Sequence, residues 1–154
     1  MSNTAPLPSP IELLLVEDDD NDIRITQRAL ARSAMRARIE VVRDGQAALD
    51  YVQAKAPYEG RRRPQLVLLD ISLPKMNGIE VLRTIKADPA LRSIPVLMLT
   101  TSARPEDVAT AYAHGANGYV CKPIHFARFV EVVADLSEYW GQVALLPTSS
   151  VSTT

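Results

Sequence analysis

The sequence is poor in cysteine, in export signals and in long apolar runs. Its single cysteine, Cys121, cannot form an internal disulfide bond. The first ten residues, MSNTAPLPSP, have neither the basic start nor the apolar stretch of a secretory signal. Runs such as LVLL and VLML are far too short to cross a bilayer. These absences predict a cytoplasmic protein with no membrane segment.

The sequence also lacks an excess of either charge. It has 17 lysines and arginines against 18 aspartates and glutamates, which gives a formal net charge of -1. Nucleic acids and anionic membranes bind proteins largely through basic surfaces, so the composition predicts neither partner. With 47% hydrophobic residues among 154, the chain has enough apolar material for the core of one globular domain.

Five short apolar runs alternate with segments of helical periodicity. The runs cover residues 11–16, 39–42, 66–69, 94–99 and 119–121. Apolar residues recur at helical spacing after each run, and Val108, Ala109 and Tyr112 mark the fourth of these helices. Strands that are apolar on both faces and alternate with helices predict an α/β fold with a doubly wound, five-stranded parallel sheet.

The segments outside this pattern predict the limits of the domain. We expect one domain over residues 10–140, preceded by a disordered segment, 1–9, and followed by a partly disordered tail, 141–154. The ends of the chain carry little apolar material to offset the entropy lost on ordering. The polar loop 54–64 contains three consecutive arginines and is predicted to be a solvated surface.

Polar residues follow four of the predicted strands. Glu17 and Asp18 come after the first run, Asp70 after the third, Thr100 after the fourth and Lys122 after the fifth. Ligands bind at the carboxyl ends of the strands in a doubly wound sheet, so these side chains are expected to converge. Each has an ordinary explanation when taken alone; the first two acids, for example, would also suit a helix cap. Converging carboxylates repel one another unless a cation intervenes, and the set therefore predicts a magnesium site.

The same set predicts phosphoryl transfer. Catalysis of that reaction consists mainly of positioning and of neutralising charge, which a cation, a lysine and a hydroxyl around one carboxylate provide. Asp70 ends the run QLVLLD and is the predicted nucleophile. The following residues, ISLPKMNG, predict a loop from which a backbone carbonyl also reaches the metal.

Four motifs, LLLVEDDDND, LVLLDISLPKMNG, VLMLTTSA and GANGYVCKPI, stand in an order and spacing that resemble the receiver domain of two-component response regulators. The resemblance covers residues 10–138 and implies a flavodoxin-like fold with strand order 2-1-3-4-5. It implies that a histidine kinase phosphorylates Asp70. It also implies that Mg²⁺ is held by Glu17, Asp18, Asp70 and the backbone carbonyl of Ser72, with Asp18 as a direct ligand.

The resemblance also implies how the signal arises. Thr100 and Lys122 would bind phosphoryl oxygens, with Lys122 pairing with Asp70 beforehand. The Lys122–Pro123 peptide bond would be cis, which X–Pro bonds tolerate at low cost. Tyr119 matches the aromatic that turns inward when Thr100 moves toward the phosphate. The face formed by the fourth helix, fifth strand and fifth helix would then change shape.

A narrower resemblance concerns the partner. The loop GRRRP and the tail VVADLSEYWGQVALLP resemble single-domain receivers that partner phytochrome-type histidine kinases. The aromatic tail in that subfamily implies a homodimer contact, while the alternative is that Trp140 covers the bottom of the core. The chain stops soon after the resemblance ends, so we expect no output domain. Its effect would then come from binding a downstream protein target or from passing the phosphoryl group to a histidine phosphotransfer protein.

Two other functions fit parts of the pattern. A haloacid-dehalogenase-type phosphatase also combines a nucleophilic Asp, a hydroxyl, a Lys and magnesium acids, but Ser72 stands where its second Asp would be. A pseudo-receiver, which only docks, usually lacks one of the five residues, and all five are present here. We therefore expect a phosphoacceptor that phosphorylates itself and loses the group slowly, not a classical enzyme.

The remaining acids and the cysteine receive structural interpretations. Asp19, Asp20 and Asp22 are expected at a helix start or on the surface, not as metal ligands. Cys121 is expected to be a small buried core residue with no redox role.

Overall fold

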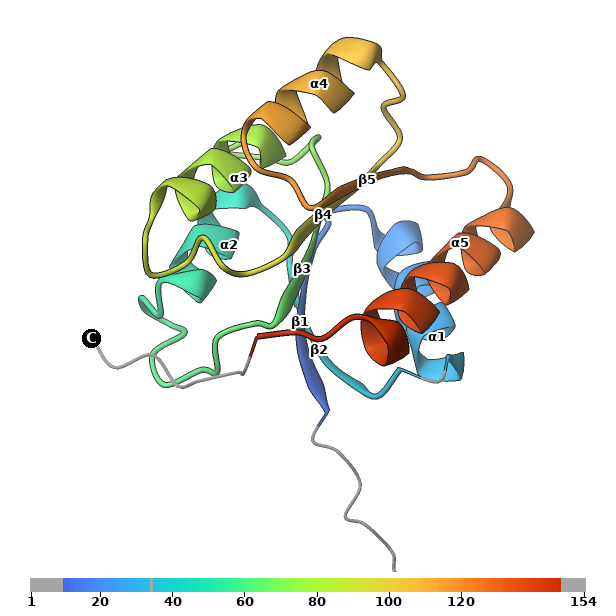
Figure 1. The fold of residues 1–154 in the computed structure, drawn as a ribbon, viewed down its shortest axis with the longest axis horizontal. Coiled ribbons are helices and arrows are strands. Elements are labelled where there is room, and N and C mark those ends of the chain that lie inside the picture. The colour runs from blue at the N-terminus through green and yellow to red at the C-terminus, as the bar shows by residue number, and fades with distance from the viewer. Residues whose placement is uncertain (1–9, 34, 148–154) are drawn as a thin grey trace, which may run out of the picture.

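The computed structural model describes residues 10–33 and 35–147 of the chain. Strands and helices alternate along it (Figure 1). The strands are β1 (Ile11–Val16), β2 (Ala37–Val42), β3 (Leu66–Leu69), β4 (Val96–Thr100) and β5 (Gly118–Cys121). The helices are α1 (Asp20–Arg32), α2 (Gly45–Val52), α3 (Gly78–Ala87), α4 (Pro105–Ala113), α5 (Phe126–Glu138) and the π-helical segment η1 (Tyr139–Val143). The segment 1–9 and part of the tail, 148–154, which were predicted to be disordered, lie outside the described residues.

The strands form one parallel sheet with the order β2-β1-β3-β4-β5. This confirms the predicted fold class and strand order. The predicted bounds of β1 and β3 are also those of the structure, whereas β4 begins at Val96 instead of residue 94. Pro95 has no amide hydrogen to donate to a neighbouring strand, so the ladder begins after it.

The helices cover both faces of the sheet, with α1 and α5 on one side and α2, α3 and α4 on the other (Figure 1). Successive side chains of a strand point to opposite faces, so β1 supplies both cores. Leu13 and Leu15 pack under α1 and α5, while Leu14 and Val16 pack under the other three helices. The near-continuous apolar character of the strands follows from this two-sided burial.

Short polar side chains begin three helices at the carboxyl edge of the sheet. Asp19 caps α1 by accepting the amide hydrogen of Asp22 at 2.9 Å, as expected for an acid at a helix start. Asp44 caps α2 and Asn77 caps α3 in the same way. These caps fix the directions in which the chain leaves β1, β2 and β3, and so fix the loops around the predicted site.

Helix α4 packs differently from the prediction. Its expected apolar face was Val108, Ala109 and Tyr112, but Ala111 is its one buried residue and Tyr112 is 51% exposed. One small side chain gives α4 little anchorage on the core. Among the α-helices of the described residues, α4 is therefore the least embedded in the core.

The chain continues beyond α5 across the bottom of the sheet. Trp140 and Leu146 pack against the core under α1 and α5. The side-chain amide of Gln65 donates to the carbonyl oxygen of Pro147 at 2.8 Å. Trp140 thus covers the core, as one of the two alternatives predicted, and residues up to 147 lie on the domain.

Within the described ranges, no helix has both the length and the apolar character that crossing a bilayer requires.

Candidate functional site

The predicted site residues meet at the carboxyl edge of the sheet. Backbone hydrogen bonds set their positions: the amide of Asp70 donates to Val16, and the amide of Lys122 donates to Thr100, at 3.1 and 2.7 Å. Glu17 and Asp70 are therefore level with each other, one residue past the paired Val16 and Leu69, and Lys122 follows Cys121, the residue that pairs with Thr100. Because the sheet order places β1 between β2 and β3, Glu17 at the end of β1 adjoins Asp70 at the end of β3.

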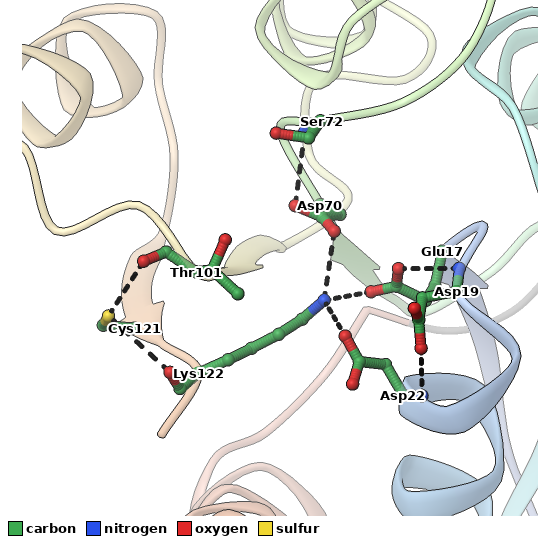
Figure 2. A network of polar contacts seen from close by, with 8 residues as sticks. All are labelled: Glu17, Asp19, Asp22, Asp70, Ser72, Thr101, Cys121 and Lys122. Carbon is green, nitrogen blue, oxygen red and sulfur yellow. Dashed lines mark hydrogen bonds and ion pairs between the residues drawn. The ribbon is translucent and has the colours of Figure 1, made fainter. Parts of the chain in front are cut away.

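The ammonium group of Lys122 lies at the centre of the site (Figure 2). It contacts Glu17, and its Nζ lies 3.0 Å from Oδ2 of Asp70 and 3.0 Å from Oδ2 of Asp22. The lysine side chain is only 2% exposed. An ammonium has three hydrogens to donate, and three carboxylates accept them here. The pair between Lys122 and Asp70 that the family resemblance implied is present.

Asp70 is buried and held at both oxygens. Oδ1 accepts the amide hydrogen of Ser72 at 3.2 Å, and Oδ2 accepts from Lys122. The following loop returns so close that a Cβ on Gly78 would lie 2.0 Å from the carbonyl oxygen of Asp70. Glycine is therefore required at position 78, and the loop fixes the backbone that carries Asp70.

Three carboxylates suit a divalent cation. Ligand oxygens of Glu17, Asp18 and Asp70 lie within 4.8 Å of one another, and hard oxygen donors of this kind are what Mg²⁺ takes. Burial raises the pKa of Glu17 to about 7, against the lowering effects of the hydrogen bond and the charge of Lys122. Independently of that shift, three carboxylates beside one ammonium leave a negative balance of charge, so the donor set fits a divalent cation.

The pKa of Lys122 shifts in the direction that keeps it charged. Burial lowers it, but the hydrogen bond with Glu17 and the charges of Asp70 and Glu17 outweigh burial and raise the pKa above its ordinary value. The site therefore contains a permanent ammonium among its acids. A group with this charge and burial is suited to holding an anionic ligand oxygen beside Asp70.

Thr100 carries a buried hydroxyl with no partner. The residue is 0% exposed, and within the described part of the chain Oγ1 makes no hydrogen bond. A buried unsatisfied hydroxyl costs about 1–3 kcal/mol, so its retention suggests a ligand oxygen that it can bind. Tyr119 lies nearby but is engaged elsewhere, because its hydroxyl donates to the carbonyl oxygen of Ser102 at 2.8 Å.

Asp22 is the site residue that sequence reasoning missed. It does lie in the first turn of α1, as expected, but its carboxylate points inward to Lys122 and not to the surface. A signal was available: residue 22 precedes the buried Thr26 by four positions and the buried Leu30 by eight, and such residues share one helix face. The buried face of α1 thus begins with an acid.

Two further expectations were wrong. Cys121 is exposed instead of buried, because it is the last residue of β5, which is an edge strand of the sheet. The Lys122–Pro123 bond is not cis; in the described part of the chain the one cis peptide is Ala56–Pro57. A trans bond is the lower-energy form even before proline.

The match of this chain to a protein family agrees with the geometry. The family model for the response regulator receiver domain matches residues 13–134. The chain belongs to this family.

The sequences of two curated relatives match this chain over most of its length. The probable methanogenesis regulatory protein FilR2 of Methanothrix harundinacea is 44% identical over 131 residues, which are 85% of this chain and 84% of the relative. Response regulator Rcp1 of Synechocystis sp. is 38% identical over 140 residues, which are 91% of this chain and 95% of the relative. The solved Mn²⁺-bound form of Rcp1 has a TM-score of 0.87 and covers 90% of this chain and 100% of its own.

The phosphorylated cyanobacterial phytochrome response regulator RcpA gives a TM-score of 0.88 at 38% identity, covering 91% of this receiver and 100% of that chain. The resemblance to receivers, and among them to phytochrome-associated ones, is thereby confirmed.

Proposed function

We propose that this receiver accepts a phosphoryl group on Asp70 from a histidine kinase, in a reaction that depends on Mg²⁺, and signals through protein contacts. One observation carries the proposal. The buried carboxylate of Asp70 is held 3.0 Å from the ammonium of Lys122, beside an acidic set that suits a divalent cation. The partnerless hydroxyl of Thr100 adds a donor at the same edge of the sheet.

In the proposed transfer, an oxygen of Asp70 forms a bond to phosphorus as the bond between phosphorus and the histidine nitrogen of the kinase breaks. The electron pair of the broken bond returns to the imidazole. The ammonium of Lys122 and the hydroxyl of Thr100 donate to phosphoryl oxygens, whose charge grows during the transfer. The amide of Ser72 holds the Asp70 carboxylate in place at 3.2 Å.

Glu17, Asp18 and Asp70, with the backbone carbonyl of Ser72, are the proposed holders of Mg²⁺. When bound, the cation supplies positive charge to the phosphoryl oxygens. The donor chemistry supports this assignment, since three carboxylates have ligand oxygens within 4.8 Å of one another. The Mn²⁺-bound structure of Rcp1 shows that a related receiver binds a divalent cation.

The proposed switch uses Thr100 and Tyr119. In this structure Tyr119 is tied to the loop after β4 through its bond to Ser102. Movement of Thr100 toward a phosphoryl oxygen pulls on that loop and allows Tyr119 to turn inward. The change is transmitted to the face of α4, β5 and α5, and the shallow anchorage of α4 at Ala111 favours such a shift.

A phytochrome-type histidine kinase is the proposed donor, because RcpA is a phytochrome response regulator and resembles this receiver over nearly its full length. FilR2, a probable methanogenesis regulatory protein, shares more identity with this receiver, so a kinase that does not sense light is the alternative donor. The signal passes to a downstream protein target. The alternative is a relay in which a histidine phosphotransfer protein takes the phosphoryl group from Asp70.

A homodimer through the C-terminal segment is also proposed. Tyr139, Val143 and Leu145 are 53%, 64% and 99% exposed on one stretch of chain, and clustered exposed apolar side chains favour an interface. The sedimentation coefficient of the full chain and of Val143→Glu tests this. A monomeric parent contradicts it.

The test of the function uses acetyl phosphate and Mg²⁺. The intact protein should gain the mass of one phosphoryl group, labile to base, and Asp70→Asn should gain none. Asp135→Asn, at an exposed acid of α5, is the matched control and should be modified like the parent. Absence of the adduct on the parent contradicts the proposal, and continuous phosphate release at enzyme rates favours the phosphatase alternative.

A further inference from the structure

Asp22 contributes a carboxylate that the helix cap does not use. Asp19 caps α1 and accepts the amide hydrogen of Asp22 itself, at 2.9 Å. The side chain of Asp22 is directed to Lys122 instead, with 3.0 Å between Oδ2 and Nζ. Figure 2 shows the two side chains approaching from α1 and from the end of β5. The contact joins residues 100 positions apart, so it is a tertiary and not a local feature.

The three acids around Lys122 fall into two groups. Glu17 and Asp70 belong, with Asp18, to the set that suits a divalent cation, and Asp22 does not. A cation at that set draws on the same carboxylates that now neutralise the lysine. Lys122 is 2% exposed, and a buried ammonium that loses its partners carries a large desolvation cost. Of the three acids around Lys122, only Asp22 lies outside the cation set and can remain paired with the lysine when the cation is bound.

We propose that Asp22 is a positioning residue, which keeps the ammonium of Lys122 in place and neutralised while a divalent cation draws on Glu17 and Asp70. The inference rests on the proposed cation site. It adds a residue that binds neither cation nor phosphoryl group and acts through Lys122. It also explains why the buried face of α1 begins with an acid at a position where an apolar residue would otherwise pack.

The main test is Mg²⁺ affinity, measured by calorimetric titration of the full chain with magnesium chloride. In Asp22→Asn the shape is kept and the charge is lost, so Lys122 depends on Glu17 and Asp70 and competes with the cation for them. We expect the affinity to fall about tenfold, as is typical for residues that support metal ligands from behind. Asp22→Glu restores the charge and should recover most of the loss.

Asp20→Asn is the matched control. It removes the same charge from the same helix turn, but the carboxylate of Asp20 pairs with Arg43 at 2.7 Å and is 70% exposed. We expect its Mg²⁺ affinity to stay within about twofold of the parent, because exposed charges are screened by solvent. An equal loss in both variants means that only net charge matters, and overturns the inference.

A variant without the lysine shows whether Asp22 affects Mg²⁺ affinity through Lys122 or by attracting the cation directly. In Lys122→Met, adding Asp22→Asn should change the Mg²⁺ affinity far less than it does in the parent. An undiminished effect there, or parent-like binding by Asp22→Asn alone, overturns the inference. If the parent binds no Mg²⁺, the proposed cation site itself is refuted.

Thermal unfolding of each variant checks that it is folded, and Asp22→Ser is the second neutral variant.

Discussion

At the scale of single residues, the site combines groups that are each costly to bury. Lys122 is balanced by three acids, whereas the hydroxyl of Thr100 has no partner in the described part of the chain. A buried hydroxyl without a hydrogen-bond partner destabilises the folded protein, and an apolar group of the same shape would not. The effect of the Thr100 hydroxyl on folding stability can therefore be measured separately from its proposed role in binding a phosphoryl oxygen.

Thr100→Val should stabilise the unphosphorylated protein. It removes the unsatisfied hydroxyl while keeping the side-chain volume, so we expect the free energy of unfolding to rise by about 1 kcal/mol. Ser137→Ala is the contrast, because Oγ of Ser137 is buried and donates to the carbonyl of Val133 at 2.8 Å. Urea unfolding of Ser137→Ala should show a lower free energy of unfolding than that of the parent. A loss of stability in Thr100→Val would mean that the hydroxyl is bonded in solution.

At the scale of helices and strands, the loops decide the geometry of the site. The loop from β3 to α3 passes so near Asp70 that position 78 has no room for a Cβ, with the carbonyl oxygen at 2.0 Å. The clash is with backbone, which cannot rotate away as a side chain can. The loop therefore fixes where Asp70 lies with respect to Lys122.

Gly78→Ala should displace that loop. We expect the free energy of unfolding to fall by about 3 kcal/mol, as in severe overpacking, together with a loss of phosphorylation by acetyl phosphate. Gly60→Ala serves for comparison, since its Cβ would meet nothing within 4 Å and only its φ of +77° opposes a side chain. That variant should lose about 1 kcal/mol and keep its phosphorylation. Equal losses in urea unfolding would contradict the close-approach argument.

The sequence predicts the elements and the strand ends well, because burial on both faces leaves a plain pattern of apolar runs. Glu17, Asp70, Thr100 and Lys122 follow directly from that pattern, since each stands where a run ends. The rotation of a helix about its axis is set by tertiary packing and is harder to predict. For this reason the side chain of Asp22 and the packing of α4 were not predicted correctly.

At the scale of the whole molecule, cation binding and folding should be linked. A ligand that binds only the folded chain stabilises it by about 2.7 kcal/mol at one hundred times its Kd. For a chain of this size we expect Mg²⁺ at that level to raise the Tm on the order of 8 °C. Asp18→Asn should lose most of this shift, and Asp20→Asn should keep it. Equal shifts in differential scanning calorimetry would exclude Asp18 as a ligand.

The contact between Lys122 and Glu17 joins residues 105 positions apart, one after the first strand and the other after the last. During synthesis Asp70 therefore emerges from the ribosome well before Lys122, whose ammonium completes the site. Fragments that end before β5 lack Lys122, so they should not be phosphorylated by acetyl phosphate even if their helices form. If Asp70 accepts the phosphoryl group as proposed, phosphorylation should require the chain through Lys122 and the assembled sheet.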